Sequence, residues 1–191
     1  MALKYRPKGY VGKGHETIGS DILSVAQILK LPVQTLGPER AAKLARVKSD
    51  QWYPIDDLLD LMDALESSVG SVGLVRMGRS IFDLSHKENL RKAASSARQV
   101  LHMFDDLYRY ANRGERIGGW HVLKFEPGYA ELENTTPHHC MMEQGILSAA
   151  LAAVDCPSTV SQSKCIRTGG HDCCIFTVSS MFTDARWNGK A

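Results

Sequence analysis

The chain has 191 residues, 43% of them hydrophobic, and a formal net charge of +2. This length and composition predict one domain around a sizeable core, and the small net charge neither favours nor excludes an anionic partner. No apolar run reaches the roughly 18 to 20 residues needed to span a bilayer, so no membrane-spanning helix is expected.

The N-terminus lacks the apolar core of a secretory signal, so we expect a cytoplasmic protein whose cysteines stay reduced. The five cysteines are an odd number, and all of them follow residue 139. An odd count in a reducing compartment favours free thiols or thiolate ligands over a disulfide framework.

Residues 1–16 form a basic arm that glycine and proline interrupt. Its cationic residues are Lys4, Arg6, Lys8 and Lys13. Such an arm is typical of a solvated, flexible terminus, and a nucleic-acid or membrane contact is the less favoured alternative. We therefore expect no nucleic-acid partner.

Apolar residues recur at helical spacing through the first half of the chain. Ser20 or Asp21 can cap the first helix, and Pro32 ends it. Gly73 and Gly78 lower the helix propensity of the fourth predicted helix. The predicted helices span about residues 20–31, 38–47, 55–69 and 71–82.

The longest predicted helix begins at Ser85 and ends near residues 112–114. Ser85 and Glu88 have the spacing of a capping box. One apolar stripe continues from Leu90 to Tyr108 and includes Phe104, so this helix is expected to pack on the core.

His102 lies on the polar side of this long helix. Arg98, Asp105 and Arg109 share its side, at about 100° or more from the apolar stripe. A helical histidine could be an axial haem ligand, but this position favours a solvent-facing side chain.

The pattern changes from helical to extended after residue 117. Gly169-Gly170 predicts a two-residue hairpin between the last two strands. Strands are predicted at residues 120–125, 129–133, 159–166 and 173–179, with a helix at about 140–154.

The predicted fold class is α+β. A helical N-terminal half, residues 17–114, packs on a four-stranded antiparallel ββαββ sheet formed by residues 117–182. Together they make a single domain, residues 17–182. Residues 183–191 are expected to form a polar, frayed tail.

Cys140, Cys165 and Cys173 are the candidate metal ligands. Cys140 begins the helix that should cover the sheet, where a helix N-terminus favours a thiolate. Tetrahedral zinc takes four ligands from cysteine, histidine or carboxylate. His139 is the fourth candidate ligand, and the alternatives are His138, His171 and Gln162.

The hairpin register decides which cysteines can meet. A two-residue turn would place Cys165 opposite Cys174, whereas a three-residue turn would place it opposite Cys173. Packing in the core is the competing interpretation for all of them, and it is preferred for Cys156 and Cys174.

Trp120 and His121 are adjacent on a predicted strand and therefore point to opposite faces. One of them could line a pocket between the sheet and the helices and donate a hydrogen bond to a buried polar ligand. Phe104 on the long helix is the third candidate ligand-binding residue. The alternative, Trp120 in the core and His121 on the surface, fits the sequence equally well.

The chain carries no motif of a familiar enzyme class. It lacks a G-x-S-x-G elbow, a phosphate-binding glycine loop and an H-E-x-x-H helix. Cys140 could be named as a nucleophile with His171 as its base, but nothing in the spacing of these residues in the sequence favours this pair. A binding protein is therefore favoured over an enzyme, and no catalytic residue is assigned.

The segment from Trp120 to Val178 resembles the 4-vinyl-reductase-like domain, a small-molecule-binding module related to the Bet3 fold. The apolar helix after Cys140 and the hairpin from Cys165 to Cys173 carry the resemblance. It implies a ligand pocket between helices and sheet, and often a homodimer.

The phenol-sensing members of that family add two expectations. They hold a structural zinc with three cysteines and a glutamate, and Cys140, Cys165 and Cys173 look like the cysteines. Gln162, a poor zinc ligand, stands in place of the glutamate, so a histidine would have to substitute. Trp120 looks like the tryptophan that contacts the phenol.

The order of helices followed by ββαββ also resembles the haem–nitric-oxide-binding (H-NOX) domain. This resemblance implies haem, with His102 as its proximal ligand. The family's Tyr-x-Ser-x-Arg motif, which holds the haem propionates, is replaced here by the residues at 131–135, ELENT.

The sequence therefore predicts a sensor domain that binds a small apolar or aromatic ligand in a buried pocket. The expected cofactor is a structural zinc. The chain is expected to form a homodimer and to act on a downstream signalling protein. The alternatives are a haem-based gas sensor and a tetrapyrrole-related reductase.

Overall fold

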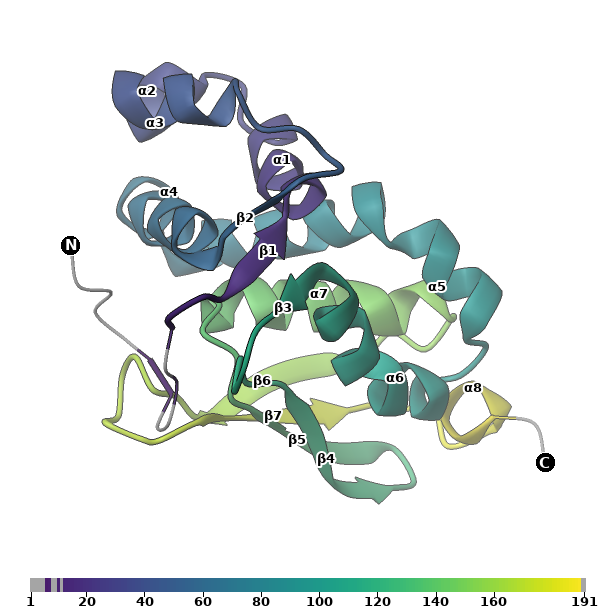
Figure 1. The fold of residues 1–191 in the computed structure, drawn as a ribbon. Helices are drawn as coiled ribbons and strands as arrows, with labels where there is room; N and C mark the ends of the chain where they lie inside the picture. Colours follow the sequence, from purple (N-terminus) through teal and green to yellow (C-terminus); the bar gives the residue numbers. More distant parts are fainter. Residues whose placement is uncertain (1–5, 8–9, 11, 190–191) are drawn as a thin grey trace.

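The computed structural model describes residues 6–7, 10 and 12–189 and has an α+β fold with two antiparallel sheets, which confirms the predicted class (Figure 1). Within the described residues, no helix is both long and apolar enough to cross a membrane. The helices are α1 (Gly19–Gln27), α2 (Pro32–Leu36), α3 (Pro38–Leu44), α4 (Ile55–Ser85), α5 (Lys87–Ala93), α6 (Ala97–Ala111), α7 (Cys140–Ala153) and α8 (Ala185–Asn188). The strands are β1 (Glu16–Ile18), β2 (Trp52–Pro54), β3 (Asn112–Arg113), β4 (Trp120–Glu126), β5 (Tyr129–Asn134), β6 (Thr159–Lys164) and β7 (Cys174–Ser179).

The larger sheet has the strand order β4-β5-β7-β6, and α7 lies between it and α4 (Figure 1). Alternate residues of the central strands, including Leu132, Phe176 and Val178, are completely buried. This period of two is expected where one face of a sheet is covered. Because α7 is covered on both sides, its sequence is apolar nearly all round, unlike that of a surface helix.

Helices α4 and α7 touch through their backbones. A Cβ atom added to Gly78 would lie 2.0 Å from the carbonyl oxygen of Met142, and one added to Gly145 would lie 2.1 Å from that of Val75. Real Cβ atoms do not approach oxygen so closely. Glycine is therefore required at this crossing on both helices.

The helix boundaries differ from those predicted at two places. The predicted helices at 55–69 and 71–82 run on as α4, with a kink at Gly70, whose φ of 64° and ψ of 178° interrupt the helical geometry. The long helix predicted from Ser85 is two helices, because Ala94 is extended and ends α5. Ser96, not Ser85, caps α6, and its side chain accepts a hydrogen bond from the Gln99 N–H.

A second sheet, with the order β2-β1-β3, was not predicted. It pairs β1, which begins at the last residue of the basic arm, with residues next to the start of α4 and the end of α6. His15 is buried, and its Nε2 lies 2.5 Å from the Glu115 carbonyl oxygen. The arm is thus fixed to the domain at residues 15–18, whereas Lys4 and Lys8 lie outside the described residues.

The C-terminal segment also differs from the predicted polar tail. It forms α8, and Trp187 is completely buried. The Trp187 ring stacks on Phe125 at 5.2 Å, and its indole N–H donates to the Glu126 carbonyl oxygen. One aromatic residue thus secures α8 to the end of β4.

Replacing Gly145 with alanine tests the helix crossing. The added methyl group must push α7 away from α4, so we expect Gly145→Ala to lower the free energy of unfolding by about 3 kcal/mol. Ser67→Ala, at an exposed position of α4, should change it by less than about 0.5 kcal/mol. Urea unfolding followed by circular dichroism measures both, and equal effects would contradict the required contact.

Candidate functional site

A cavity of about 70 Å³ lies between the N-terminal helices and the sheet, bounded by α1, α4, α6, α7 and β4. Its wall is mainly apolar. Residues that supply this apolar wall include Val25, Leu58, Met62, Phe82, Phe104 and Trp120.

Two of the three predicted ligand-binding residues line this cavity. Phe104 and Trp120 meet edge to face, with ring centroids 4.9 Å apart, and Phe176 supports Trp120 from the sheet at 5.0 Å. His121 is exposed and does not line the cavity, because adjacent strand residues point to opposite faces. Trp120 is therefore the member of that pair on the cavity side.

One part of the cavity wall is polar and carries acidic side chains. Its residues are Asp21, His86, Asn112, His138 and Glu143. Among the described residues that line the cavity, none is lysine or arginine. The cavity therefore joins an apolar wall to a polar group that includes two carboxyl groups.

His138 and Glu143 form a buried pair in this polar group. The Nδ1 atom of His138 lies 2.8 Å from Oε1 of Glu143, and the two side chains are 7% and 5% exposed. Tyr108 packs against the His138 ring at 5.3 Å. Since a carboxylate only accepts, Nδ1 donates to it, and Nε2 has no hydrogen-bond partner in the described structure.

Asp21 and Asn112 add two further atoms that have no hydrogen-bond partner in the part of the chain that the structure describes. Oδ1 of Asp21 lies 3.9 Å from Nε2 of His86, beyond hydrogen-bond distance. Burial raises the pKa of the Asp21 carboxyl, although His86 and His138 oppose this shift. The Asn112 amide donates to the Tyr108 carbonyl oxygen at 2.9 Å, which leaves Asn112 Oδ1 unpaired.

Unpaired buried polar atoms destabilise a folded protein, by about 1–3 kcal/mol each. Asp21 Oδ1, Asn112 Oδ1 and His138 Nε2 all belong to residues of one cavity wall. A bound ligand or water that donates hydrogen bonds would remove this cost.

The sequence analysis did not assign Asp21, His86, Asn112 or Glu143 to a site. Glu143 carried a usable signal, because it interrupts the apolar sequence between Met142 and Ile146. The other three lie at helix ends, where polar residues are common, and only the tertiary fold brings them to one cavity.

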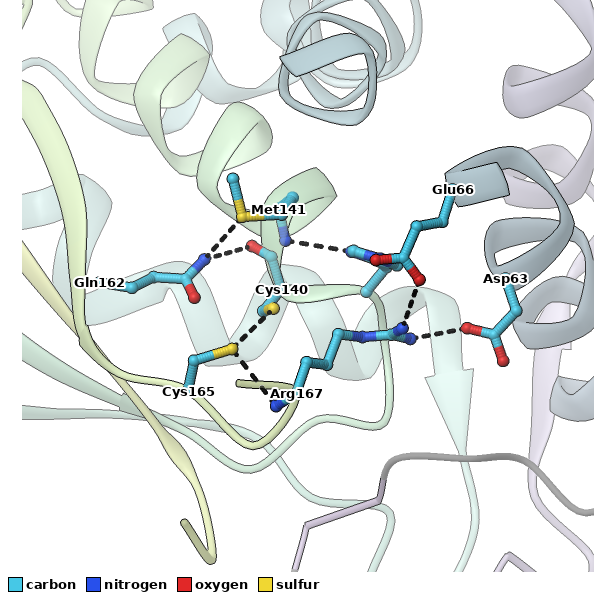
Figure 2. A network of polar contacts seen from close by, with 8 residues as sticks. Asp63, Glu66, Cys140, Met141, Gln162, Cys165 and Arg167 are labelled. Carbon is cyan, nitrogen blue, oxygen red and sulfur yellow. Dashed lines mark hydrogen bonds and ion pairs between the residues drawn. The ribbon is translucent and has the colours of Figure 1, made fainter. Parts of the chain in front are cut away.

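A second polar region surrounds the start of α7 and contains a cysteine cluster, Cys140, Cys165 and Cys174 (Figure 2 shows the first two). Their sulfur atoms lie within 4.8 Å of one another, and the Cys140 and Cys165 sulfurs are 3.3 Å apart. All three side chains are buried.

Cys174, not Cys173, is the third member of this cluster. Lys164 pairs with Ile175, so the next residues, Cys165 and Cys174, face each other at the strand ends. The Cys173 sulfur instead lies 3.6 Å from Oε2 of Glu133. The predicted two-residue turn is wrong, because residues 165–173 form a longer loop between β6 and β7.

His139, the predicted fourth ligand, is engaged elsewhere. Its Nδ1 accepts from the Met141 N–H at 3.2 Å, and its Nε2 lies 3.2 Å from Oε1 of Glu66. Gln162 donates to the Cys140 carbonyl oxygen (Figure 2). Neither side chain supplies a fourth ligand in this arrangement, and a groove of about 420 Å³ beside Cys140 and Cys165 gives solvent access.

The pKa of one thiol of the cysteine cluster, that of Cys140, is raised above its ordinary value. Hydrogen bonding with Cys174, followed by burial, raises the pKa of the Cys140 thiol to about 12. These two effects on the pKa of Cys140 are larger than the lowering expected at a helix N-terminus. The predicted thiolate is therefore not favoured at this position. A metal bound by Cys140 would have to displace the proton of this thiol, so the metal affinity would rise with pH.

The overall fold is similar to that of solved H-NOX proteins. An S. oneidensis H-NOX mutant in the Fe(II) state has 13% identity and a TM-score of 0.63, with 88% of this chain and 98% of that chain covered. An unliganded Fe(II) H-NOX protein from K. algicida has 10% identity and a TM-score of 0.64, with 85% and 96% covered. The S. oneidensis protein in its Fe(II)NO state has 14% identity and a TM-score of 0.62, with 85% and 98% covered.

No protein-family model and no curated protein matches this chain. At 10–14% identity, the structural similarity establishes the fold and not the ligand. It agrees with the second resemblance seen in the sequence, to H-NOX domains. The resemblance to 4-vinyl-reductase-like domains stays a prediction.

Replacing Asp21 with asparagine should stabilise the protein at neutral pH. Because the pKa of Asp21 is raised on folding, the folded state binds its proton more tightly, and stability falls as pH rises above about 3.8. An asparagine here carries no charge, so Asp21→Asn removes the free-energy penalty of burying the Asp21 carboxylate. We expect its free energy of unfolding to exceed that of the parent at pH 7, with the difference shrinking as pH approaches 4.

Urea unfolding at several pH values measures this difference. Asp106→Asn, at an exposed position of α6, is the matched control and should show no comparable gain. A destabilised Asp21→Asn protein at pH 7 would contradict the assignment.

Proposed function

We propose that this chain is a sensor domain that binds a small molecule in the cavity between its N-terminal helices and its sheet. One observation carries the proposal: a mainly apolar cavity has, on the polar part of its wall, three buried polar atoms with no hydrogen-bond partner among the described residues. Binding sites commonly combine apolar walls with a few convergent polar groups. The cavity is pre-formed, so a ligand need not open the core.

The fold supports a sensing role. The similar solved structures include H-NOX proteins in Fe(II) and Fe(II)NO states. Here α1, α4, α6 and α7 all contribute to the cavity. A ligand would therefore contact most of the elements that pack the two halves together. A homodimer and a downstream signalling partner belong to the same proposal.

Haem is the cofactor that the fold suggests, but the residues present do not fit it. His102 is exposed on α6, its ring lies 6.1 Å from that of Phe125, and it does not line the cavity. A cavity of about 150 Å³ holds one benzene molecule, so about 70 Å³ leaves no room for a tetrapyrrole. We therefore place the haem-sensor and tetrapyrrole-reductase alternatives second.

The cysteine cluster supports a structural zinc as a separate proposal. Zinc–sulfur bonds of about 2.3 Å in a tetrahedron separate the sulfurs by about 3.8 Å. The observed distances, from 3.3 Å to at most 4.8 Å, bracket this value. Three thiolates from Cys140, Cys165 and Cys174 would hold the ion, with water or a rotated His139 as the fourth ligand.

Filling the cavity should abolish ligand binding. With ethanol as the probe, a molecule with half the heavy atoms of benzene, we expect saturable chemical-shift changes at residues lining the cavity in the parent protein. Ala111 is buried on the cavity wall, and Ala111→Leu adds three carbon atoms there. We expect this variant to lose the shift changes, or to weaken binding by at least about tenfold.

Ala152→Leu is the matched control, because Ala152 is exposed on α7, and it should bind ethanol like the parent. Equal binding by Ala111→Leu would contradict the cavity as the site. A Soret band in the purified protein that is lost in His102→Ala would overturn our ranking in favour of haem.

Cysteine substitutions test the zinc proposal and the hairpin register together. We expect about one zinc per chain by elemental analysis, lost in Cys174→Ser and kept in Cys173→Ser. These neighbouring residues form a matched pair, because only Cys174 belongs to the cluster. The opposite pattern, or metal-free parent protein, would contradict the proposal.

A further inference from the structure

Arg167 joins the loop between β6 and β7 to helix α4 (Figure 2). Its side chain is 7% exposed, and its guanidinium donates to Asp63 Oδ1 at 2.7 Å and to Glu66 Oε2 at 3.1 Å. Because burying an unpaired charge is costly, a buried guanidinium requires such partners. The two carboxylates therefore fix the place of the Arg167 side chain.

Two consecutive backbone N–H groups of this loop face sulfur atoms of the cysteine cluster. The N–H of Arg167 donates to the Cys165 sulfur, and the N–H of Ile166 donates to the Cys174 sulfur, both at 3.4 Å. Hydrogen bonds to the ligand atoms orient the ligands of a metal. The start of the loop thus sets the position of two of the three sulfurs.

Glu66 also approaches the third cysteine. Its Oε1 lies 3.2 Å from Nε2 of His139, the residue directly before Cys140, whereas its Oε2 accepts from Arg167. One carboxylate group of α4 therefore contacts sequence neighbours of both Cys140 and Cys165, whose sulfurs are 3.3 Å apart.

The remainder of the loop, residues 168–172, is exposed. Ordering a flexible segment when a ligand binds costs conformational entropy and weakens binding. Attachment of Arg167 to α4 orders the start of the loop in advance, so a metal need not supply this free energy.

We infer that Arg167 is a positioning residue of the proposed zinc site and does not bind the metal itself. Its ion pairs with α4 hold the start of the loop, and the N–H groups of the loop hold the Cys165 and Cys174 sulfurs. This inference rests on the proposed structural zinc. Loss of such supporting contacts typically lowers metal affinity by about 10- to 100-fold.

Two alanine substitutions, one turn apart on α4, test the inference. Asp63→Ala removes a partner of Arg167, whereas Asp60→Ala removes the partner that Arg40 holds with two hydrogen bonds. Both changes are the same in chemistry, but only Arg167 belongs to the cysteine loop. We expect Asp63→Ala to weaken cobalt(II) and zinc binding at least about fivefold, and Asp60→Ala less than about twofold.

Arg167→Met removes both ion pairs and keeps a long apolar side chain. We expect it to weaken metal binding at least about tenfold. Arg40→Met is its matched control and should bind metal like the parent.

Cobalt(II) titration measures the affinity through the thiolate-to-cobalt charge-transfer absorption, and competition with zinc gives the zinc affinity. A residue that only stabilised the fold would leave both the affinity of the folded protein and this absorption unchanged. Urea unfolding of the metal-free proteins is the parallel measurement. We expect Asp63→Ala and Asp60→Ala to lose similar free energies of unfolding, so that stability does not explain a difference in metal affinity.

Three results would count against the inference. Metal affinity like that of the parent in Asp63→Ala or in Arg167→Met would overturn the positioning role and leave the zinc site. An equal loss in Asp60→Ala would also overturn it, because the effect would then belong to α4 in general. A parent protein that took up neither cobalt nor zinc would overturn the zinc proposal together with this inference, whereas ethanol binding tests the cavity independently.

Discussion

The backbone contact between α4 and α7 is the constraint on which the rest of the structure depends. Gly78 and Gly145 allow the two helices to approach until carbonyl oxygens occupy the space of side chains. This approach fixes α7 against α4 on one side while the other side covers Leu132 and Phe176 of the sheet. The cavity lies beside this crossing, where larger side chains hold the neighbouring helices apart.

Much of the fold could be predicted from local signals. Prolines at positions 32 and 38, the apolar stripe ending at Tyr108 and the extended pattern after residue 117 all mark real elements. The small sheet could not be predicted, because β1, β2 and β3 are two or three residues long and pair across up to 97 positions. Gly70 was ambiguous, since a single residue with positive φ can end a helix or bend it.

The candidate site was less predictable, for reasons of geometry. A one-residue choice in the hairpin register exchanged Cys173 for Cys174, and the nine-residue loop that decides it has no regular sequence signal. Trp120 and Phe104 were accessible to prediction because strand alternation and helical periodicity place them inward. Asp21 and Asn112 were not, because their common position arises only when α1 packs near the end of α6.

The kink at Gly70 divides α4 into two segments that are held by different parts of the molecule. The segment after the kink is fixed to α7 at Gly78, whereas Arg167 of the β6–β7 loop binds Asp63 and Glu66 on the segment before it (Figure 2). That first segment also lines the cavity. The cavity and the cysteine cluster thus adjoin one segment of α4, which both Arg167 and His139 contact at Glu66. A ligand that shifted this segment would change the metal affinity of the cluster, and by thermodynamic linkage a bound metal would change the ligand affinity by the same factor.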